Sequence, residues 1–161
     1  MKFAIEVRMA WRLGVYLCAA ALFGGLAAAE DVRSYTTKTG FDEVQFELTN
    51  AIIGRGLTID YAGNIGRMLE RTGPDVGSVK PLYTRAEFVM FCSAKLSRAM
   101  MEADLGNIGF CPYVIFLYEA AARPGETVVG YRRPISGGGT ASPVLAEIDS
   151  LLDAIAKDAV K

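Results

Sequence analysis

The chain has 161 residues, 17 basic and 18 acidic side chains, a formal net charge of −1 and no histidine. The missing histidine excludes Ser-His-Asp and Cys-His catalysis, histidine-ligated haem and most zinc enzymes. Nucleic acid is excluded as a partner because binding a phosphate backbone needs clustered cations, and the adjacent pair Arg132-Arg133 is interpreted as a solvated strand end.

The first 29 residues are typical of an export signal. Three basic residues lie near the start, and the apolar stretch 13–29 that follows closes with three alanines before an acidic pair. Small residues at such a junction are accepted by signal peptidase. We therefore expect a signal peptide over 1–29, a single mature domain over 30–161, and a periplasmic or secreted location. The alternative is a retained membrane anchor, although the 17 residues of the apolar stretch are fewer than the about 20 of a typical span. Any membrane contact is expected through this segment alone.

Hydrophobic periodicity predicts the elements of the mature region. Phe41, Val44, Leu48 and Ile52 recur at helical spacing, and the apolar run 114–118 is the strongest strand. In chain order we predict a strand over 32–38, a helix over 41–52, a strand over 57–61 and a short helix over 64–71. After a loop over 73–82 we predict a strand over 83–92, a helix over 93–104 and a linker over 105–109. The remaining predicted elements are a strand over 112–119, a strand over 127–133, a flexible spacer over 137–139 and a closing helix over 142–160.

This order predicts an α/β (α+β) fold with a single twisted sheet of about five strands and helices packed on it as a two-layer sandwich. Strands separated by helices require crossover connections, so the sheet is expected to be mixed. The end of the strand at 88–92 is apolar on both faces, which indicates a central place in the sheet.

Several segments of the mature region resemble the family catalogued as domain of unknown function 302. They are Gly40-Phe41, Gly56, Phe91-Cys92-Ser93, Pro112 with Tyr118-Glu119, and Tyr131-Arg132-Arg133-Pro134. The resemblance implies a compact α/β sandwich, often a homodimer, with no settled biochemical activity. Family members frequently carry an Asn-Pro pair after the third strand, where this chain has Ser93-Ala94.

The mature region holds two cysteines, Cys92 and Cys111, with 18 residues between them. Three interpretations stay open: a disulfide, as expected in an oxidising compartment, two inert buried thiols, or functional thiols. Parallel neighbouring strands would separate the two sulfurs, because a disulfide requires Cα atoms within about 7 Å. An antiparallel arrangement would remove this objection.

Functional thiols would act in redox chemistry or in binding a soft metal. Thiolate and thioether ligands suit Cu(I), so Cys92 and Cys111 are candidate ligands together with Met100 or Met101. The alternative for both methionines is core packing at helical spacing. No resident cofactor is identified.

The sequence therefore favours an exported binding or accessory domain of unknown ligand, non-enzymatic and homodimeric. The alternative is a thiol-dependent protein that handles a soft metal or acts in redox chemistry. The strand over 127–133, taken as a sheet edge, or the closing helix is expected to supply the dimer surface. Asp60, Glu87 and Glu119 remain available carboxylates, but no catalytic residue is assigned.

Overall fold

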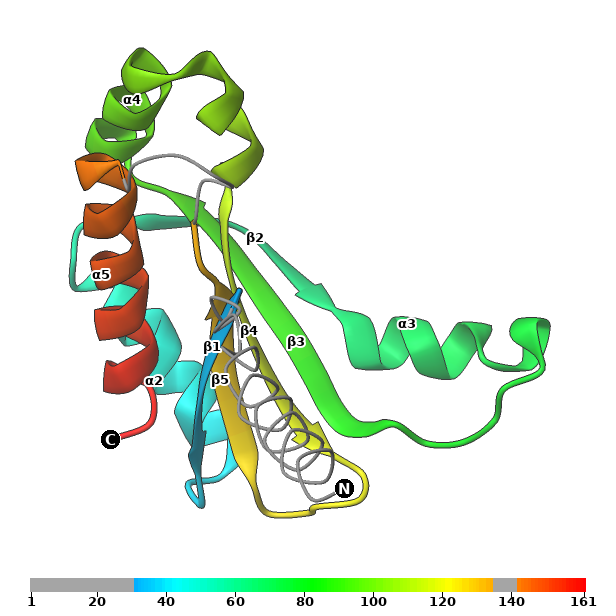
Figure 1. The fold of residues 1–161 in the computed structure, drawn as a ribbon. Coiled ribbons are helices and arrows are strands. Elements are labelled where there is room, and N and C mark those ends of the chain that lie inside the picture. Colours follow the sequence, from blue (N-terminus) through cyan, green and yellow to red (C-terminus); the bar gives the residue numbers. More distant parts are fainter. Residues whose placement is uncertain (1–30, 135–141) are drawn as a thin grey trace, which may run out of the picture.

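The computed structural model describes residues 31–134 and 142–161 (Figure 1). The predicted signal peptide and the glycine spacer at 137–139 lie outside these residues. The sheet comprises β1 (Val32–Thr37), β2 (Thr58–Asn64), β3 (Tyr83–Cys92), β4 (Tyr113–Ala120) and β5 (Thr127–Arg132). The helices are α2 (Phe41–Ile53), α3 (Ile65–Thr72), α4 (Ala94–Ala103) and α5 (Pro143–Asp158), with short 3-10 helices η1 (Pro74–Val76) and η2 (Leu105–Phe110).

The five strands lie in the order β1-β5-β4-β3-β2, and all four pairings are antiparallel. The predicted five-stranded sheet with packed helices is confirmed, but the sheet is not mixed. β1, β2 and β4 run in the same direction without being neighbours. The connection through α2 joins β1 at one edge of the sheet to β2 at the other edge. The segment that contains α4 and η2 begins and ends at the same end of the sheet, where β3 ends and β4 begins. A helix between two strands therefore produces no parallel pair here.

The expectation that the strand over 127–133 forms a sheet edge is wrong. β5 lies between β4 and β1, and its residues from Thr127 to Tyr131 are buried. No local pattern indicates the outer neighbour of β5, which is β1, the first strand of the described residues. An interior strand has both sides paired, so β5 offers no edge to a second copy.

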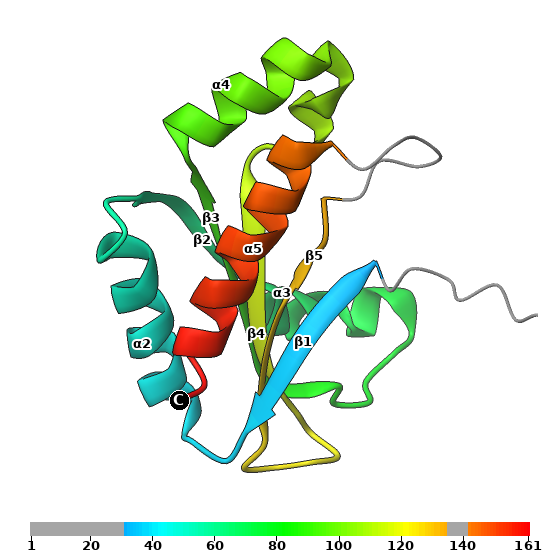
Figure 2. The same cartoon turned by 60° about the vertical axis from the view of Figure 1, so that its left-hand side comes forward.

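The main core lies between one face of the sheet and the helices α2, α4 and α5. Figure 2 shows α5 crossing in front of the strands with α2 beside it, and α4 at the end where β3 finishes. The helical face predicted from Phe41 is buried on the sheet, which confirms the periodicity argument. Buried side chains shared by sheet and helices include Val44, Leu48, Ile52, Phe91, Ile115, Leu117, Val129, Ile148, Leu152 and Ile155.

Asp149 of α5 fixes the helix to the end of β5. Arg133 donates from Nη2 to Asp149 Oδ2 at 2.9 Å and from Nε to Oδ1 at 3.1 Å, while the buried Tyr131 donates its hydroxyl to the same carboxylate at 3.2 Å. The prediction that Arg132 and Arg133 are both solvated therefore holds only for Arg132, which is exposed, because Arg133 binds the helix.

Asp153, one turn further along α5, receives three donors. Arg33 donates at 3.0 Å, Lys157 at 2.7 Å, and the Tyr35 hydroxyl also donates to this carboxylate. Burial raises the pKa of Asp153, but the hydrogen bonds from Lys157, Tyr35 and Arg33 outweigh it and lower the pKa to about 2. Asp153 therefore stays ionised and holds α5 against β1.

No helix in the described ranges is both long enough and apolar enough to cross a membrane.

Candidate functional site

The two cysteines meet at the end of the sheet beneath α4. Cys92 is the last residue of β3, Cys111 lies just before β4, and their Sγ atoms are 2.7 Å apart. Because β3 and β4 are antiparallel, the end of one strand is adjacent to the beginning of the next. The objection to a disulfide that a parallel arrangement would raise does not apply to this sheet. We call Cys92 and Cys111 the thiol pair.

Hydroxyl groups lie beside the thiol pair. Ser97 of α4 places its Oγ 3.6 Å from Cys111 Sγ and 3.2 Å from the hydroxyl of Tyr113. Burial has the largest effect on the pKa of Cys92, and the hydrogen bond with Cys111 and the charge of Cys111 act in the same direction. Together they raise this pKa to about 11. The negative charge of the nearby Asp60 acts in the same direction. Reduced Cys92 is therefore protonated at neutral pH, and a protonated thiol is a poor nucleophile and a poor metal ligand.

The two methionines proposed as soft-metal ligands are placed differently. Met100 is fully buried in the core, and its backbone carbonyl accepts a hydrogen bond from Asn107 Nδ2 at 2.8 Å. Met101 is half-buried and packs against the core. Within residues 31–134 and 142–161, no three Cys, Asp or Glu side chains gather as a metal site would require. A site that combines the thiol pair with Met100 or Met101 stays a prediction.

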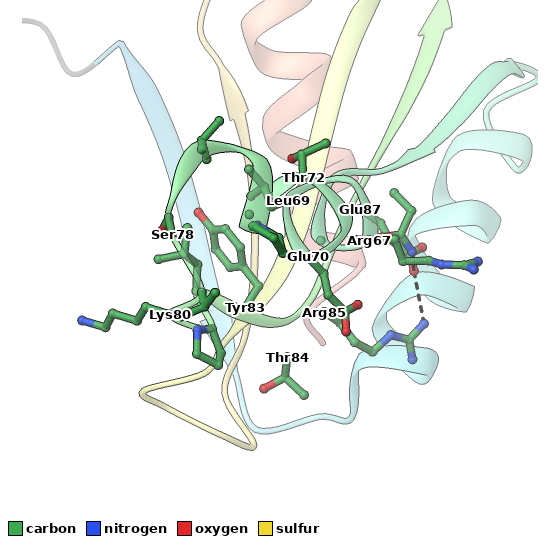
Figure 3. Close-up of a pocket in the computed structure, with 18 residues that line it drawn as sticks. Arg67, Leu69, Glu70, Thr72, Ser78, Lys80, Tyr83, Thr84, Arg85 and Glu87 are labelled. Carbon is green, nitrogen blue, oxygen red and sulfur yellow. Dashed lines mark hydrogen bonds and ion pairs between the residues drawn. The ribbon is translucent and has the colours of Figure 1, made fainter.

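A second candidate site lies at the opposite end of β3, under an arm formed by residues 65–82. α3, η1 and the segment that returns to β3 line a hollow of about 640 Å³, within the usual range of small-ligand sites, about 300–1,000 Å³. Figure 3 shows Glu70 and Tyr83 toward the middle of this hollow, whereas Arg67 and Lys80 extend outward on opposite sides. We call it the arm hollow. The sequence predicts only a loop over 73–82, and no pattern in it indicates a hollow.

The charged residues on the inner wall of the arm hollow are bound to their neighbours. Glu87 accepts hydrogen bonds from Asn64 at 3.2 Å and from Arg85 at 3.3 Å. Arg85 also pairs with Asp42 and lies 4.0 Å from the ring centre of Phe41. In contrast, among the described residues neither Arg67 nor Lys80 takes part in an ion pair. The charges available to a ligand are therefore Arg67 and Lys80 at the rim and Glu70 toward the middle of the hollow.

The arm leaves its apolar side chains exposed. No residue of α3 is buried, although its pattern is strongly amphipathic. Exposed apolar residues continue along the arm at Met68, Val76, Val79 and Leu82, of which Val79 is 82% exposed. An isolated helix of fewer than about 12 residues is marginal in water. α3 therefore depends on contacts other than its own backbone hydrogen bonds.

An aromatic surface continues from the arm across the sheet face that points away from α2 and α5. Phe88 and Phe116 pair across β3 and β4, flanked in register by Gly63 and Gly130. A Cβ atom at Gly63 would lie 2.4 Å from the Phe88 ring, and one at Gly130 would lie 2.5 Å from the Phe116 ring. Each phenylalanine thus lies over a glycine of the neighbouring strand.

Tyrosines extend this surface on both sides. Tyr61 lies 5.8 Å from Phe88 between ring centres, Phe116 lies 6.1 Å from Tyr118, and Tyr118 lies 5.4 Å from Tyr83. A register irregularity between Tyr83 and Arg85 accompanies the placement of Tyr83 beside Tyr118. Tyr83 also lines the arm hollow, so the hollow and the aromatic face adjoin. We use the term aromatic face for Tyr61, Tyr83, Phe88, Phe116 and Tyr118.

The carboxylates noted from the sequence do not form a catalytic pair. Asp60 is exposed on the edge strand β2, Glu119 is half-buried at the end of β4, and Glu87 is held by Asn64 and Arg85.

Comparison with known proteins assigns the fold. A family model described as "Domain of unknown function DUF302" matches residues 33–159. Among solved structures, the chain is similar to an uncharacterized conserved protein DUF302 from Bacillus stearothermophilus, with 17% sequence identity and a TM-score of 0.66, over 81% of this chain and 99% of that chain. No curated protein matches the chain. The family model covers nearly all of the predicted mature region, and this chain belongs to the DUF302 family.

Proposed function

We propose that this chain is an exported, non-enzymatic binding domain that works as a homodimer. The proposal rests on the arm, which contains the amphipathic helix α3. No residue of this helix is buried. Apolar side chains such as Val76 and Val79 are 75% and 82% exposed. Exposed apolar patches rimmed by polar residues mark interaction surfaces.

The aromatic face of a second copy is the partner that suits this arm. Tyr61 and Tyr83 of the aromatic face are 58% and 38% exposed, so they offer large apolar surfaces with a polar tip. The arm and the aromatic face adjoin on one side of each copy, so two copies related by a two-fold axis would each bury the arm of the other. In such an isologous pair, one set of contacts is made twice.

The ligand is proposed to bind in the arm hollow. The wall charges of Arg85 and Glu87 are satisfied by each other and by their neighbours, which leaves them little freedom for acid–base chemistry. Arg67 and Lys80 at the rim favour a small molecule that carries a negative group, and Glu70 toward the middle favours a hydrogen-bond donor on the same molecule. Because an arm buried in the dimer would be fixed in place, dimerisation and ligand binding are expected to support each other.

Sedimentation velocity tests the dimer. The chain is expressed with its own leader, recovered from the compartment that receives it, and compared over a range of concentrations. We expect a dimer, and we expect Val79→Asp to shift the population to monomers. Leu105→Asp is the matched control, because Leu105 is also 82% exposed but lies in η2 at the other end of the sheet.

Three outcomes would count against the proposal. A wild-type protein that sediments as a monomer at every concentration removes the homodimer. A dimer that responds equally to Val79→Asp and Leu105→Asp removes the arm as its interface. Recovery of the chain from the cell interior with residues 1–29 intact removes the export. Native mass spectrometry of the same sample reports whether a small molecule remains bound.

A further inference from the structure

We propose that Cys92 and Cys111 form an intrachain disulfide that ties the end of β3 to the beginning of β4. The two Sγ atoms are 2.7 Å apart, and a disulfide bond joins sulfur atoms at about 2.0 Å. The antiparallel pairing of β3 and β4, which ends with Phe91 opposite Tyr113, already holds the two backbones together beside the cysteines. The inference does not depend on the dimer or on the arm hollow.

The reaction is a thiol–disulfide exchange. Cys92 and Cys111 lose two protons and two electrons as the Sγ–Sγ bond forms, and the disulfide of oxidised glutathione or of an exchange protein accepts them and becomes two thiols. A thiol of high pKa is a poor leaving group, and burial raises the pKa of Cys92. Release of Cys92 from the bond is therefore slow, which suits a structural disulfide better than a catalytic one.

The bond would join the two ends of the segment that contains α4 and η2. That segment is anchored by the buried side chains of Leu96 and Met100 and by the buried Asn107. Its tip is weakly held, since Leu105 and Ile108 are 82% and 64% exposed. Joining the two residues at its base restricts the unfolded chain over the 18 intervening residues without any new contact at the tip.

Peptide mapping tests the bond directly. The folded full-length chain is equilibrated with oxidised glutathione, its free thiols are blocked, and it is digested with trypsin without reductant. We expect a linked species that joins the peptide 86–95 to the peptide that begins at Ala99, and we expect dithiothreitol to separate them. The third cysteine, Cys18, lies in the predicted leader and in neither peptide, so it does not contribute to this linked species.

Thermal unfolding measures what the bond contributes. We expect dithiothreitol to lower the melting temperature of the wild-type chain by about 10 °C. The double variant Cys92→Ala, Cys111→Ala keeps both sites small and apolar, and its melting temperature should not respond to dithiothreitol.

Complete blocking of both cysteines in the folded chain after oxidised glutathione treatment would overturn the proposal. Linkage of either residue to Cys18 would also overturn it, as would a soft metal ion bound at the pair that prevents the linkage. The last result would instead favour the thiol-dependent function predicted as an alternative from the sequence.

Discussion

Replacing Gly130 with alanine is expected to destabilise the fold by about 2 kcal/mol. The new methyl group would lie 2.5 Å from the ring of Phe116 and 2.7 Å from the backbone carbonyl oxygen of Arg33. The ring can shift, but the carbonyl belongs to β1, which pairs with β5 along its whole length. Overpacking of this kind costs about 1–3 kcal/mol, and a clash with paired backbone puts the cost near the upper end, about 3 kcal/mol. The lower backbone entropy of alanine in the unfolded chain returns about 0.5–1 kcal/mol, which leaves a net loss of about 2 kcal/mol. The net loss corresponds to a decrease of about 6–10 °C in melting temperature.

Urea unfolding followed by far-ultraviolet circular dichroism measures this loss. Tryptophan fluorescence is unsuitable because the single tryptophan is Trp11, in the predicted leader. Gly109→Ala is the control, since a Cβ atom at Gly109 has no heavy atom within 4 Å, and it should change the free energy of unfolding by less than about 0.5 kcal/mol. Equal effects of the two variants would refute the close packing of Phe116 on β5.

Two further predictions concern polar groups. Asp153→Asn should destabilise the protein at pH 7 by about 1–2 kcal/mol, a range discounted for the solvent exposure of its partners Arg33 and Lys157. Because folding lowers the pKa of Asp153 to about 2, this contribution is present above the ordinary aspartate pKa of about 4 and is lost as the pH falls toward 2. Denaturant titrations measure the free energy of unfolding of variant and wild type across this range. A difference in that free energy that stays constant from pH 7 to pH 2 would contradict the assignment. Asn107→Leu should cost about 1–3 kcal/mol, because the carbonyl of Met100 loses its buried donor; native-state hydrogen exchange should report faster exchange in α4, and unchanged exchange there would contradict the role given to Asn107.

The elements that the sequence predicted well are those with a local signal. The apolar face that begins at Phe41 defines α2, and the predicted bounds 83–92 coincide with β3. The predicted strand over 57–61 was too short, because β2 continues to Asn64, whose partner Glu87 lies in another strand. The predicted linker over 105–109 is the 3-10 helix η2, which begins where Asp104 accepts a hydrogen bond from the backbone of Gly106 at 2.7 Å.

The candidate sites depended on information that is not local. The spacing of Cys92 and Cys111 allowed adjacent or distant sulfurs, and only the antiparallel direction of β3 and β4 brings them together. The arm hollow required the fold of 65–82 over the beginning of β3, which no periodicity within that segment encodes. The exposed apolar residues of α3 were visible as a pattern, but the sequence could not show that the rest of the fold leaves them unburied.

The pairing of β1 with β5 has a consequence for synthesis of the chain. Val32 pairs with Arg132, so the first described strand finds its partner only after almost all of the polypeptide has been made. Contacts between residues so distant along the chain carry a large loop-closure cost and slow the folding reaction. A nascent chain that is still attached to the ribosome therefore cannot complete its sheet, and it stays open to chaperones that bind extended polypeptides.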